Sequence, residues 1–502
     1  MSLAKVHSAA VIGLEAYPVE VEVDISNGLP SFSIVGLPDK AIEEAKERVR
    51  SAIRNSGADF PAKRITVNLA PADIKKEGSA FDLAIALGIL IADEQIPQVK
   101  SDILLAGELA LNGELRRING ILAMVASLGN FSEIILPQQN AVEASLVDSL
   151  IITPAKNLKE IIFHLKKEKD LPPYFKKFKI IAKENNELDF SDIKGQEQAK
   201  RALEIAAAGN HNVYFTGPPG SGKTLLARTF VTILPKLTQK EILEITKIYS
   251  VAGLLKQDNP IITQRPFRAP HHTTSPIALV GGGAYPRPGE ITLAHRGVLF
   301  MDEFAEFPRS VLEALRQPLE DGIVTVSRAQ GTMTFPAKFI LIAAQNPCPC
   351  GFWGDQTKNC ICTPVQIIKY QKRVSGPLLD RFDLAIEVPR LKYDKLVSKT
   401  AAEDSASIKN RVENARQISS KRLGKNNAEM NIKEIKIHCA INDESNRLLK
   451  NAVDQFNLSA RQFTRILKVA RTIADLESSE NIKINHLAEA LQYRTKEKKI
   501  FN

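Results

Sequence analysis

Short apolar runs alternate with helical patterns over the first 165 residues of the chain. The runs at 31–35 and 64–69 predict strands, and the amphipathic stretch 41–56 between them predicts a helix. The longest nearly uninterrupted apolar run, 83–92, is about half the roughly 20 residues that cross a bilayer. Residues 1–165 are therefore expected to form an α/β domain with that run in its core, and no membrane segment is expected.

Periodicity stops at residues 166–189, where lysines, paired prolines and Glu-Asn-Asn-Glu predict a linker. The pattern then runs helix (196–208), strand (212–216), loop, and helix from Leu225 onward. This is the order of a βα unit, so a second α/β module is expected to begin near residue 190.

Further buried strands are predicted at 297–301 and 339–343, which makes the module 190–390 a doubly wound parallel sheet with flanking helices. Beyond it the chain is charged, and residues 460–476 repeat apolar positions at three- and four-residue spacing. We predict a separate helical lid domain over 391–502.

Basic residues outnumber acidic ones by 67 to 57, which gives a net charge of +10. This balance favours a polyanionic partner through phosphate contacts and counterion release, although charge on solvated faces explains it about equally well. The N-terminus carries a single Lys5 and a short apolar stretch that runs into Glu15, which is not the order of a signal peptide. A cytoplasmic protein is expected.

A phosphate-binding loop follows the strand at 212–216 and has the spacing G-x-x-x-x-G-K-[ST]. Its backbone N–H groups and the helix N-terminus that it opens suit a nucleotide anion. We expect Lys223 to pair with the β- and γ-phosphates of ATP, and the Thr224 hydroxyl to bind Mg²⁺. The predicted nucleotide contacts are Gly217, Pro218, Pro219, Gly220, Ser221, Gly222, Lys223, Thr224 and Leu225.

Two carboxylates, Asp302 and Glu303, end the apolar strand at 297–301. Asp302 can hold hydrated Mg²⁺, and Glu303 can polarise the water that attacks the γ-phosphate. Asn346 follows the next buried strand and should lie beside Asp302 at the same edge of the sheet, where it can orient that water. Taken singly, an acidic turn and an asparagine before a proline are ordinary features.

Residues 192–390 resemble the AAA+ module of magnesium-chelatase-type ATPases, and the whole chain is similar to the YifB/ComM group of that clade. The segments that carry the resemblance are Arg-Ala-Pro-His-His-Thr (268–273), Gly-Gly-Gly-Ala-Tyr-Pro-Arg-Pro-Gly-Glu (281–290), Ala-His-Arg-Gly (294–297), Asn-Pro-Cys-Pro-Cys-Gly (346–351) and Ser-Gly-Pro-Leu-Leu-Asp-Arg-Phe-Asp (375–383). The resemblance implies ATP and Mg²⁺ as cofactors and assembly into a homo-hexameric ring.

The same resemblance implies two arginines that complete the nucleotide site. Arg381 would be an arginine finger that reaches the γ-phosphate of the neighbouring subunit, with Arg373 as the alternative finger. Arg461 would be a second-sensor arginine on the lid. Either Arg381 or Arg461 could instead belong to a surface salt bridge.

In this clade a hairpin before the sensor strand points into the ring pore, and residues 324–335 match it. Their alternation around a Gly-containing turn supports a hairpin independently. Arg328 is then the candidate for contact with DNA phosphates. The alternative is a hairpin that only packs at a subunit interface.

Residues 1–165 resemble a Lon-protease-like domain, in which Ser79 lies near the position of the serine nucleophile. A Ser-Lys dyad also needs a lysine to take the proton, and Leu122 stands where that lysine would be. A hydrocarbon side chain cannot act as a base. The domain is therefore interpreted as non-proteolytic, with a role in scaffolding or substrate binding.

Four of the five cysteines form two pairs, Cys348 with Cys350 and Cys360 with Cys362. They provide enough thiolates for a tetrahedral Zn²⁺ site, although the spacing within each pair is tighter than usual; reduced thiols in a loop are the alternative. A metal there would rigidify the loop after Asn346. For His271 and His272, two interpretations have about equal support: they bind a ligand or DNA, or they are ordinary loop residues.

The leading hypothesis from the resemblance is a branch-migration helicase of natural transformation, which acts on single-stranded and branched DNA together with recombination proteins. The first alternative is a magnesium-chelatase motor that drives metal insertion into a porphyrin. The second is an ATP-dependent protease, which Leu122 disfavours.

Overall fold

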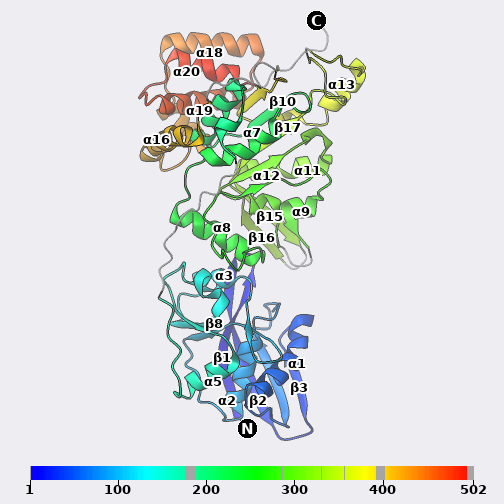
Figure 1. The fold of residues 1–502 in the computed structure, drawn as a ribbon, viewed down its shortest axis with the longest axis vertical. Helices are drawn as coiled ribbons and strands as arrows, with labels where there is room; N and C mark the ends of the chain where they lie inside the picture. Colours follow the sequence, from blue (N-terminus) through cyan, green and yellow to red (C-terminus); the bar gives the residue numbers. More distant parts are fainter. Residues whose placement is uncertain are drawn as a thin grey trace. The chain divides into compact units, whose positions relative to one another are not determined.

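The computed structural model describes residues 2–175, 188–283, 287–328, 331–355, 357–391 and 402–494. The chain divides into two compact units, one formed by Met1–Ile181 and Gln239–Thr263 and the other by Ala182–Thr238 and Gln264–Asn502 (Figure 1). Residues 176–187, half of the linker expected at 166–189, lie outside the described residues, as do residues 392–401.

The first unit is built on a seven-stranded mixed sheet of order β3-β4-β2-β1-β5-β8-β9. Strands β1 and β2 form a long antiparallel pair, and β5, β8 and β9 follow in parallel. The strands are β1 (Ser2–Ile12), β2 (Glu15–Ser26), β3 (Ser31–Val35), β4 (Arg64–Ala70), β5 (Ile103–Leu105), β8 (Glu133–Pro137) and β9 (Ile151–Ala155). A small antiparallel pair, β6 (Glu108–Leu109) with β7 (Leu115–Arg116), lies outside this sheet.

Helix α2 (Asp82–Ala92) is buried along its whole length, as expected for the apolar run at 83–92. No helix among the described residues combines the length and hydrophobicity needed to cross a membrane. The other helices contributed by the N-terminal part of the chain are α1 (Lys40–Asn55), α3 (Ile121–Ser127), α4 (Ala141–Ala144) and α5 (Leu158–Leu165).

A sixth helix of the first unit, α8 (Gln239–Val251), comes from far along the chain, inside the stretch expected to form the second α/β module. The backbone N–H of Gly120, which starts α3, donates to the carbonyl oxygen and the hydroxyl of Ser250 at 3.2 and 3.1 Å. Arg117 donates to the carbonyl oxygen of Leu255 at 2.7 Å. Glu143, a fully buried carboxylate, accepts from the hydroxyl of Ser250. Residues 239–263 are thus anchored by polar contacts within the first unit.

The second unit contains a five-stranded sheet of order β11-β14-β17-β10-β18. All neighbouring strands are parallel, which confirms the parallel sheet expected from the buried apolar runs. The strands are β10 (Val213–Thr216), β11 (Phe267–Arg268), β14 (Val298–Met301), β17 (Ile340–Gln345) and β18 (Leu384–Glu387). Because parallel strands end at one edge, the residues that follow them are brought together there.

Short helices and two hairpins complete the α/β part of the second unit. The helices are α6 (Glu197–Gly209), α7 (Lys223–Thr229), α9 (Pro276–Val280), α10 (Glu290–Leu293), α11 (Arg309–Ala314), α12 (Arg316–Asp321), α13 (Pro364–Gln371) and α14 (Gly376–Leu379). The hairpins pair β12 (Gly281–Gly282) with β13 (Arg287–Pro288), and β15 (Ile323–Arg328) with β16 (Gly331–Pro336).

The C-terminal part is helical, and its apolar faces join those of α6 and the parallel sheet in one hydrophobic core. Helix α19 has the bounds predicted from the apolar spacing, Ala460–Leu476. The other helices are α16 (Ser405–Leu423), α17 (Ile432–His438), α18 (Asp443–Phe456) and α20 (Ile484–Gln492).

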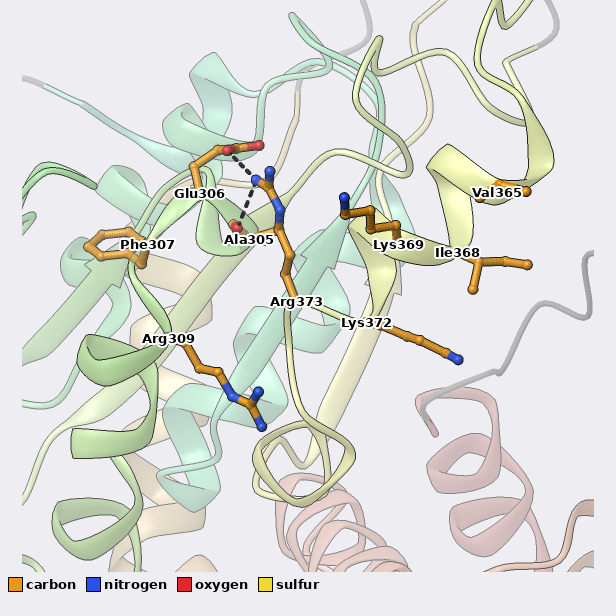
Figure 2. A pocket seen from close by; sticks show the side chains of 9 residues that line it. All are labelled: Ala305, Glu306, Phe307, Arg309, Val365, Ile368, Lys369, Lys372 and Arg373. Carbon is orange, nitrogen blue, oxygen red and sulfur yellow. Dashed lines mark hydrogen bonds and ion pairs between the residues drawn. The ribbon is translucent and has the colours of Figure 1, made fainter.

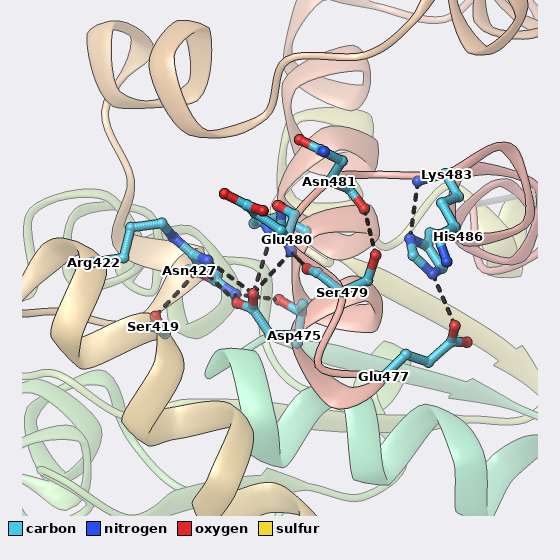
Figure 3. A network of polar contacts seen from close by, with 12 residues as sticks. Ser419, Arg422, Asn427, Asp475, Glu477, Ser479, Glu480, Asn481, Lys483 and His486 are labelled. Atoms are coloured by element: carbon cyan, nitrogen blue, oxygen red, sulfur yellow. Dashed lines mark hydrogen bonds and ion pairs between the residues drawn. The ribbon is translucent and has the colours of Figure 1, made fainter.

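A buried ionic network ties α16 to α19 (Figure 3). Asp475 is 1% exposed and accepts from both terminal nitrogens of Arg422, at 2.8 and 2.6 Å, and from the side-chain amide of Asn427 at 2.7 Å. Nε of Arg471, one turn earlier on α19, also donates to the carboxylate of Asp475, at 3.1 Å. Because every acceptor site of this carboxylate is used, the network holds the bundle in one arrangement.

Candidate active site

The phosphate loop, residues 217–222, joins the end of β10 to the start of α7. A Cβ on Gly217 would lie 2.1 Å from the carbonyl oxygen of Val388, so only glycine fits where the loop passes the end of β18. Gly220 and Gly222 have φ values of 74° and 94°, which are unfavourable for other residues. The loop therefore curls back and leads into the N-terminus of α7, the arrangement in which backbone N–H groups bind phosphate.

Lys223 is buried at the base of this loop. Its ammonium donates to the carbonyl oxygens of Gly217 and Pro218, at 2.7 and 2.9 Å, and to Oδ1 of Asn346 at 3.2 Å. Desolvation by burial lowers the pKa of Lys223 to about 8, because it penalises the charged form. A bound phosphate would offset this penalty, which is the electrostatic reason for a lysine at this position.

The end of β14 faces the start of α7. The hydroxyl of Thr224 donates to Oδ2 of Asp302 at 2.7 Å, and the other oxygen of that carboxylate accepts from the backbone N–H of Glu303 at 2.9 Å. A threonine hydroxyl and a carboxylate in contact are two of the oxygen ligands that Mg²⁺ takes in nucleotide sites. The arrangement can hold a Mg²⁺ ion between loop and strand.

Glu303 has a left-handed backbone, with φ of 52°, and a half-exposed side chain. Its Oε2 lies 3.0 Å from Nδ1 of His272, in the loop that follows β11. This contact gives His272 a partner that the sequence pattern did not identify. The sequence offers only a pair of adjacent histidines, His271 and His272, ahead of the strand that ends in the two carboxylates.

Asn346 follows β17, and its side chain reaches Lys223. The register pairs Thr216 with Gln345, so the ends of β10 and β17 are level. The hydroxyl of Tyr214 donates to the side chain of Gln345 at 2.8 Å and links the same two strands. The structure therefore brings Lys223, Thr224, Asp302 and Asn346 to one place, as expected for strand ends of one parallel sheet.

Arg381 and Arg461 lie together, bound to a shared carboxylate. Glu320, at the end of α12, accepts from Arg381 and lies 3.1 Å from a guanidinium nitrogen of Arg461. Arg381 is 6% exposed and also donates to the carbonyl oxygen of Pro377 at 2.5 Å; desolvation lowers its pKa. Within the described parts of the chain, neither arginine contacts the phosphate loop. Glu320 gave no sequence signal, because a lone glutamate on a helix is usually solvated.

A basic cavity of about 790 Å³ lies beside the segment that follows Glu303 (Figure 2). Figure 2 shows Arg373 pointing to Glu306, with which it forms a 2.5 Å ion pair. The alternative finger is thus engaged within its own chain. The lining residues are Ala305, Glu306, Phe307, Arg309, Val365, Ile368, Lys369, Lys372 and Arg373.

The four clustered cysteines converge, as their spacing predicted. All four sulfurs lie within 4.8 Å of one another, and the Sγ atoms of Cys348, Cys350 and Cys360 are 3.4–3.6 Å apart. Tetrahedral zinc with Zn–S bonds of about 2.3 Å has sulfur–sulfur edges of about 3.8 Å, so the cluster is close to that geometry. All four are free thiols.

Two thiols of this cluster, Cys350 and Cys360, have pKa values shifted in opposite directions. Burial raises the pKa of Cys350, but backbone N–H groups of Phe352 and Ile361 outweigh it and bring the value to about 6. Burial and, to a smaller extent, the neighbouring sulfurs of Cys350 and Cys348 together raise the pKa of Cys360 to about 12. A divalent cation bound by the four sulfurs would offset the repulsion between neighbouring thiolates and stabilise all four in the charged form.

Other expected site residues belong to elements outside the parallel sheet of the second unit. Strands β15 and β16 form the antiparallel pair expected at 324–335, but its tip at 329–330 and the side chain of Arg328 are outside the described residues. In the first unit, the hydroxyl of Ser79 donates to Glu108. Leu122 is fully buried at the start of α3.

Three family models match successive parts of the chain. "Magnesium chelatase, subunit ChlI" matches residues 189–396, "Subunit ChlI of Mg-chelatase" matches 21–140, and "Magnesium chelatase, subunit ChlI C-terminal" matches 402–494. The first covers the phosphate loop, both carboxylates, Asn346 and Arg381, and the third covers Arg461.

Curated relatives match over nearly the whole length. The chain is 48% identical to the competence protein ComM of Haemophilus influenzae over 502 residues, which is 98% of each protein. It is 45% identical to the YifB protein of Escherichia coli over 498 residues, which is 98% of this chain and 97% of that protein. A 67 kDa magnesium-chelatase subunit of Chlorobaculum tepidum is 27% identical over 162 residues, 32% of this chain and 23% of that protein.

Proposed function

Because the chain belongs to the YifB/ComM family of magnesium-chelatase-like AAA+ proteins, we propose that it is an ATP-driven hexameric motor that acts on DNA. The observation that carries the ATPase part is the contact of Lys223 with Asn346, together with that of Thr224 with Asp302. In this proposal Lys223 binds the β- and γ-phosphates, Thr224 and Asp302 hold Mg²⁺, and Asn346 orients the attacking water. Glu303 takes the proton of that water.

The proposed ring rests on Arg381, which does not reach the described loop of its own chain. Glu320 holds Arg381 and Arg461; Arg381 is proposed to leave it for the γ-phosphate bound by the neighbouring subunit, and Arg461 to act as the second-sensor arginine on the lid. Head-to-tail contacts of this kind form a ring when the rotation between subunits closes. Hydrolysis would then depend on assembly, because each site takes its loop from one subunit and its arginine finger from the next.

DNA is the proposed substrate, and two features support it. The net charge of +10 suits a polyanion, and the β15–β16 hairpin carries Arg328 at the place proposed to face the ring pore. The name of the relative from Haemophilus influenzae refers to competence, so we propose branch migration on single-stranded and branched DNA during natural transformation, in the cytoplasm and with recombination proteins.

We expect DNA to stimulate ATP hydrolysis several-fold and a four-way junction to be resolved into two duplexes only when ATP is supplied. Affinity for DNA should fall by about 10³ between 50 and 200 mM salt, because each phosphate contact releases counterions. ATP turnover with and without DNA, a gel assay of junctions, and binding isotherms at two salt concentrations check this. Lack of DNA binding at low salt would exclude a DNA motor.

The matches to the magnesium-chelatase models favour one second candidate, a motor for metal insertion into a porphyrin. Capture of a porphyrin-binding partner by the full chain would support that function over a DNA motor. Peptide hydrolysis is less favoured, because the buried Leu122 cannot serve Ser79 as a base. We propose that the first unit is Lon-like in fold but serves for scaffolding or substrate binding.

The cysteine cluster is proposed to hold a structural Zn²⁺ ion that braces the catalytic loops. A Cβ on Gly351, inside the cluster, would lie 2.6 Å from Pro219 of the phosphate loop and 3.8 Å from Asn346. Arg390 donates to the carbonyl oxygen of Pro219 at 3.3 Å and lies over the ring of Phe352. Loss of the metal would therefore loosen both loops.

Purified protein should contain about one zinc ion per chain, and Cys350→Ser should lose most of it, since tetrahedral sites of this kind need all four thiolates. The melting temperature and ATP turnover should fall together. Elemental analysis by mass spectrometry and thermal melts provide the measurement. Cys439→Ala, which removes a buried cysteine outside the cluster, is the matched control and should keep its zinc. A metal-free wild type with full activity would overturn the assignment.

A further inference from the structure

The finger turn, residues 380–383, joins α14 to β18 and carries Arg381. A side chain of the helical lid holds the backbone of this turn. Nη1 of Arg465, on α19, donates to the carbonyl oxygen of Arg381 at 2.8 Å and also to Oδ1 of Asp383. One guanidinium nitrogen therefore binds the turn at two points.

The residue before β10 holds the same turn. Asn212 donates from its side-chain amide to the carbonyl oxygen of Arg381 at 3.2 Å, and from its backbone N–H to Oδ2 of Asp383 at 3.0 Å. Its side-chain oxygen accepts from the backbone N–H of Leu341 in β17 at 2.8 Å. The finger turn is thus fixed to the lid by Arg465 and to the parallel sheet by Asn212.

Asp383 is a buried carboxylate that stays charged. Its side chain is 5% exposed, and that of Arg465 is 23% exposed. Burial would raise the pKa of Asp383, but the charge of Arg465, together with His211 and the backbone N–H of Asn212, holds that pKa well below its usual range. Because a buried charge without a partner is costly, the ion pair keeps Arg465 in one position.

The side chain of Arg381 is bound less firmly than the backbone of its turn. Its guanidinium pairs with Glu320, whose side chain is 45% exposed. An ion pair with an exposed carboxylate contributes little stability, so a phosphate can replace Glu320 as the partner. The backbone contacts from Arg465 and Asn212 do not involve the guanidinium of Arg381 and can persist during that exchange.

We propose that Arg465 is a positioning residue for the arginine finger: with Asp383 it fixes the backbone of the finger turn, so that only the side chain of Arg381 moves to the γ-phosphate. Misplacement of a catalytic group by about 1 Å can cost about 10² in rate, so the position of the turn matters as much as the presence of the arginine. This inference rests on the proposed role of Arg381.

Arg465→Gln should lower ATP turnover by about 10²-fold and leave the affinity for ATP unchanged, because the shorter amide cannot reach both acceptors while the phosphate loop stays intact. Arg465→Lys keeps a charge beside Asp383 and should restore part of the turnover. Arg422→Gln is the matched control, since Arg422 pairs with another buried aspartate of α19, Asp475, in the network of Figure 3. It should lower the melting temperature but keep turnover.

Two further measurements separate positioning from stability. Arg381→Ala/Arg465→Gln should be no slower than Arg381→Ala, because Arg465 acts only through the finger. Mixing Arg465→Gln subunits with Lys223→Ala subunits should restore part of the turnover, since the latter supply an intact finger turn. Arg465→Gln/Asp383→Asn leaves no buried charge unpaired; it should melt close to the wild type and still turn over slowly, so it carries the test if Arg465→Gln alone unfolds.

Turnover of Arg465→Gln near that of the wild type would overturn the inference, as would losses that multiply in the variant that also lacks Arg381. A loss of ATP affinity as large as the loss of turnover would overturn it too, since Arg465 would then support the fold of the nucleotide site. Normal turnover by Arg381→Ala would instead show that the proposed finger is wrong, and that single variant is measured independently of Arg465.

Discussion

Replacement of Glu303 by glutamine should leave ATP bound and lower its turnover by about 10²- to 10⁴-fold, the usual contribution of a general base. Glutamine keeps the size and the hydrogen-bonding oxygen of the side chain but cannot take a proton. Lys223 and the Thr224–Asp302 contact are untouched, so affinity for ATP should change little. Binding of a fluorescent ATP analogue and steady-state phosphate release measure the two effects separately.

Two comparisons sharpen this expectation. Glu306→Gln removes a nearby carboxylate that pairs with Arg373, and it should retain most of the activity. Lys223→Ala should lose ATP binding itself, because no other ammonium reaches the carbonyl cradle at Gly217 and Pro218 in the described residues. Normal turnover by Glu303→Gln would show that another group takes the proton.

Replacement of Arg381 by alanine should lower turnover by about 10³- to 10⁵-fold, the range known for arginine fingers. The loss should be repaired in part by mixing with Lys223→Ala subunits. In a mixed ring, a loop from an Arg381→Ala subunit can meet a finger from a Lys223→Ala subunit, and random assortment of equal amounts makes about one quarter of the sites intact. Phosphate release across a series of mixing ratios measures the recovery.

Absence of recovery at every ratio would contradict a finger that acts between subunits. Arg373→Ala, tested in the same mixtures, distinguishes the two candidate fingers, because Arg373 is paired with Glu306 and Arg381 with Glu320. Gel filtration should accompany both experiments, since a variant that no longer assembles would lose activity for another reason.

The parts of the site that depend on strand ends could be predicted from the sequence. Glycine spacing located the phosphate loop, and apolar runs located the strands that carry Asp302 and Asn346. Parallel strands must bring those residues to one edge, so the pattern determined their proximity. The helix Ala460–Leu476 was equally clear, because its apolar face is long and regular.

Contacts between side chains on different elements could not be predicted. Glu320 joins Arg381 to Arg461, and His272 reaches Glu303, through distances set by helix packing and loop paths. Periodicity reports which face of an element is buried, but not which polar partner meets it. The hydrogen bonds of Ser250 on α8 with Gly120 and Glu143 could not be predicted from the sequence for the same reason.

Because α8 belongs to the first unit, that unit consists of two separate segments of the chain and cannot be removed by a single cut. The chain passes from one unit to the other near residues 181, 238 and 263, so three covalent connections join them. A fragment that ends near residue 181 would lack α8 and expose the buried Glu143, while cleavage at that point would leave the fragment bound to the rest through α8. Exchange of the first unit between proteins therefore requires two segments to be exchanged together.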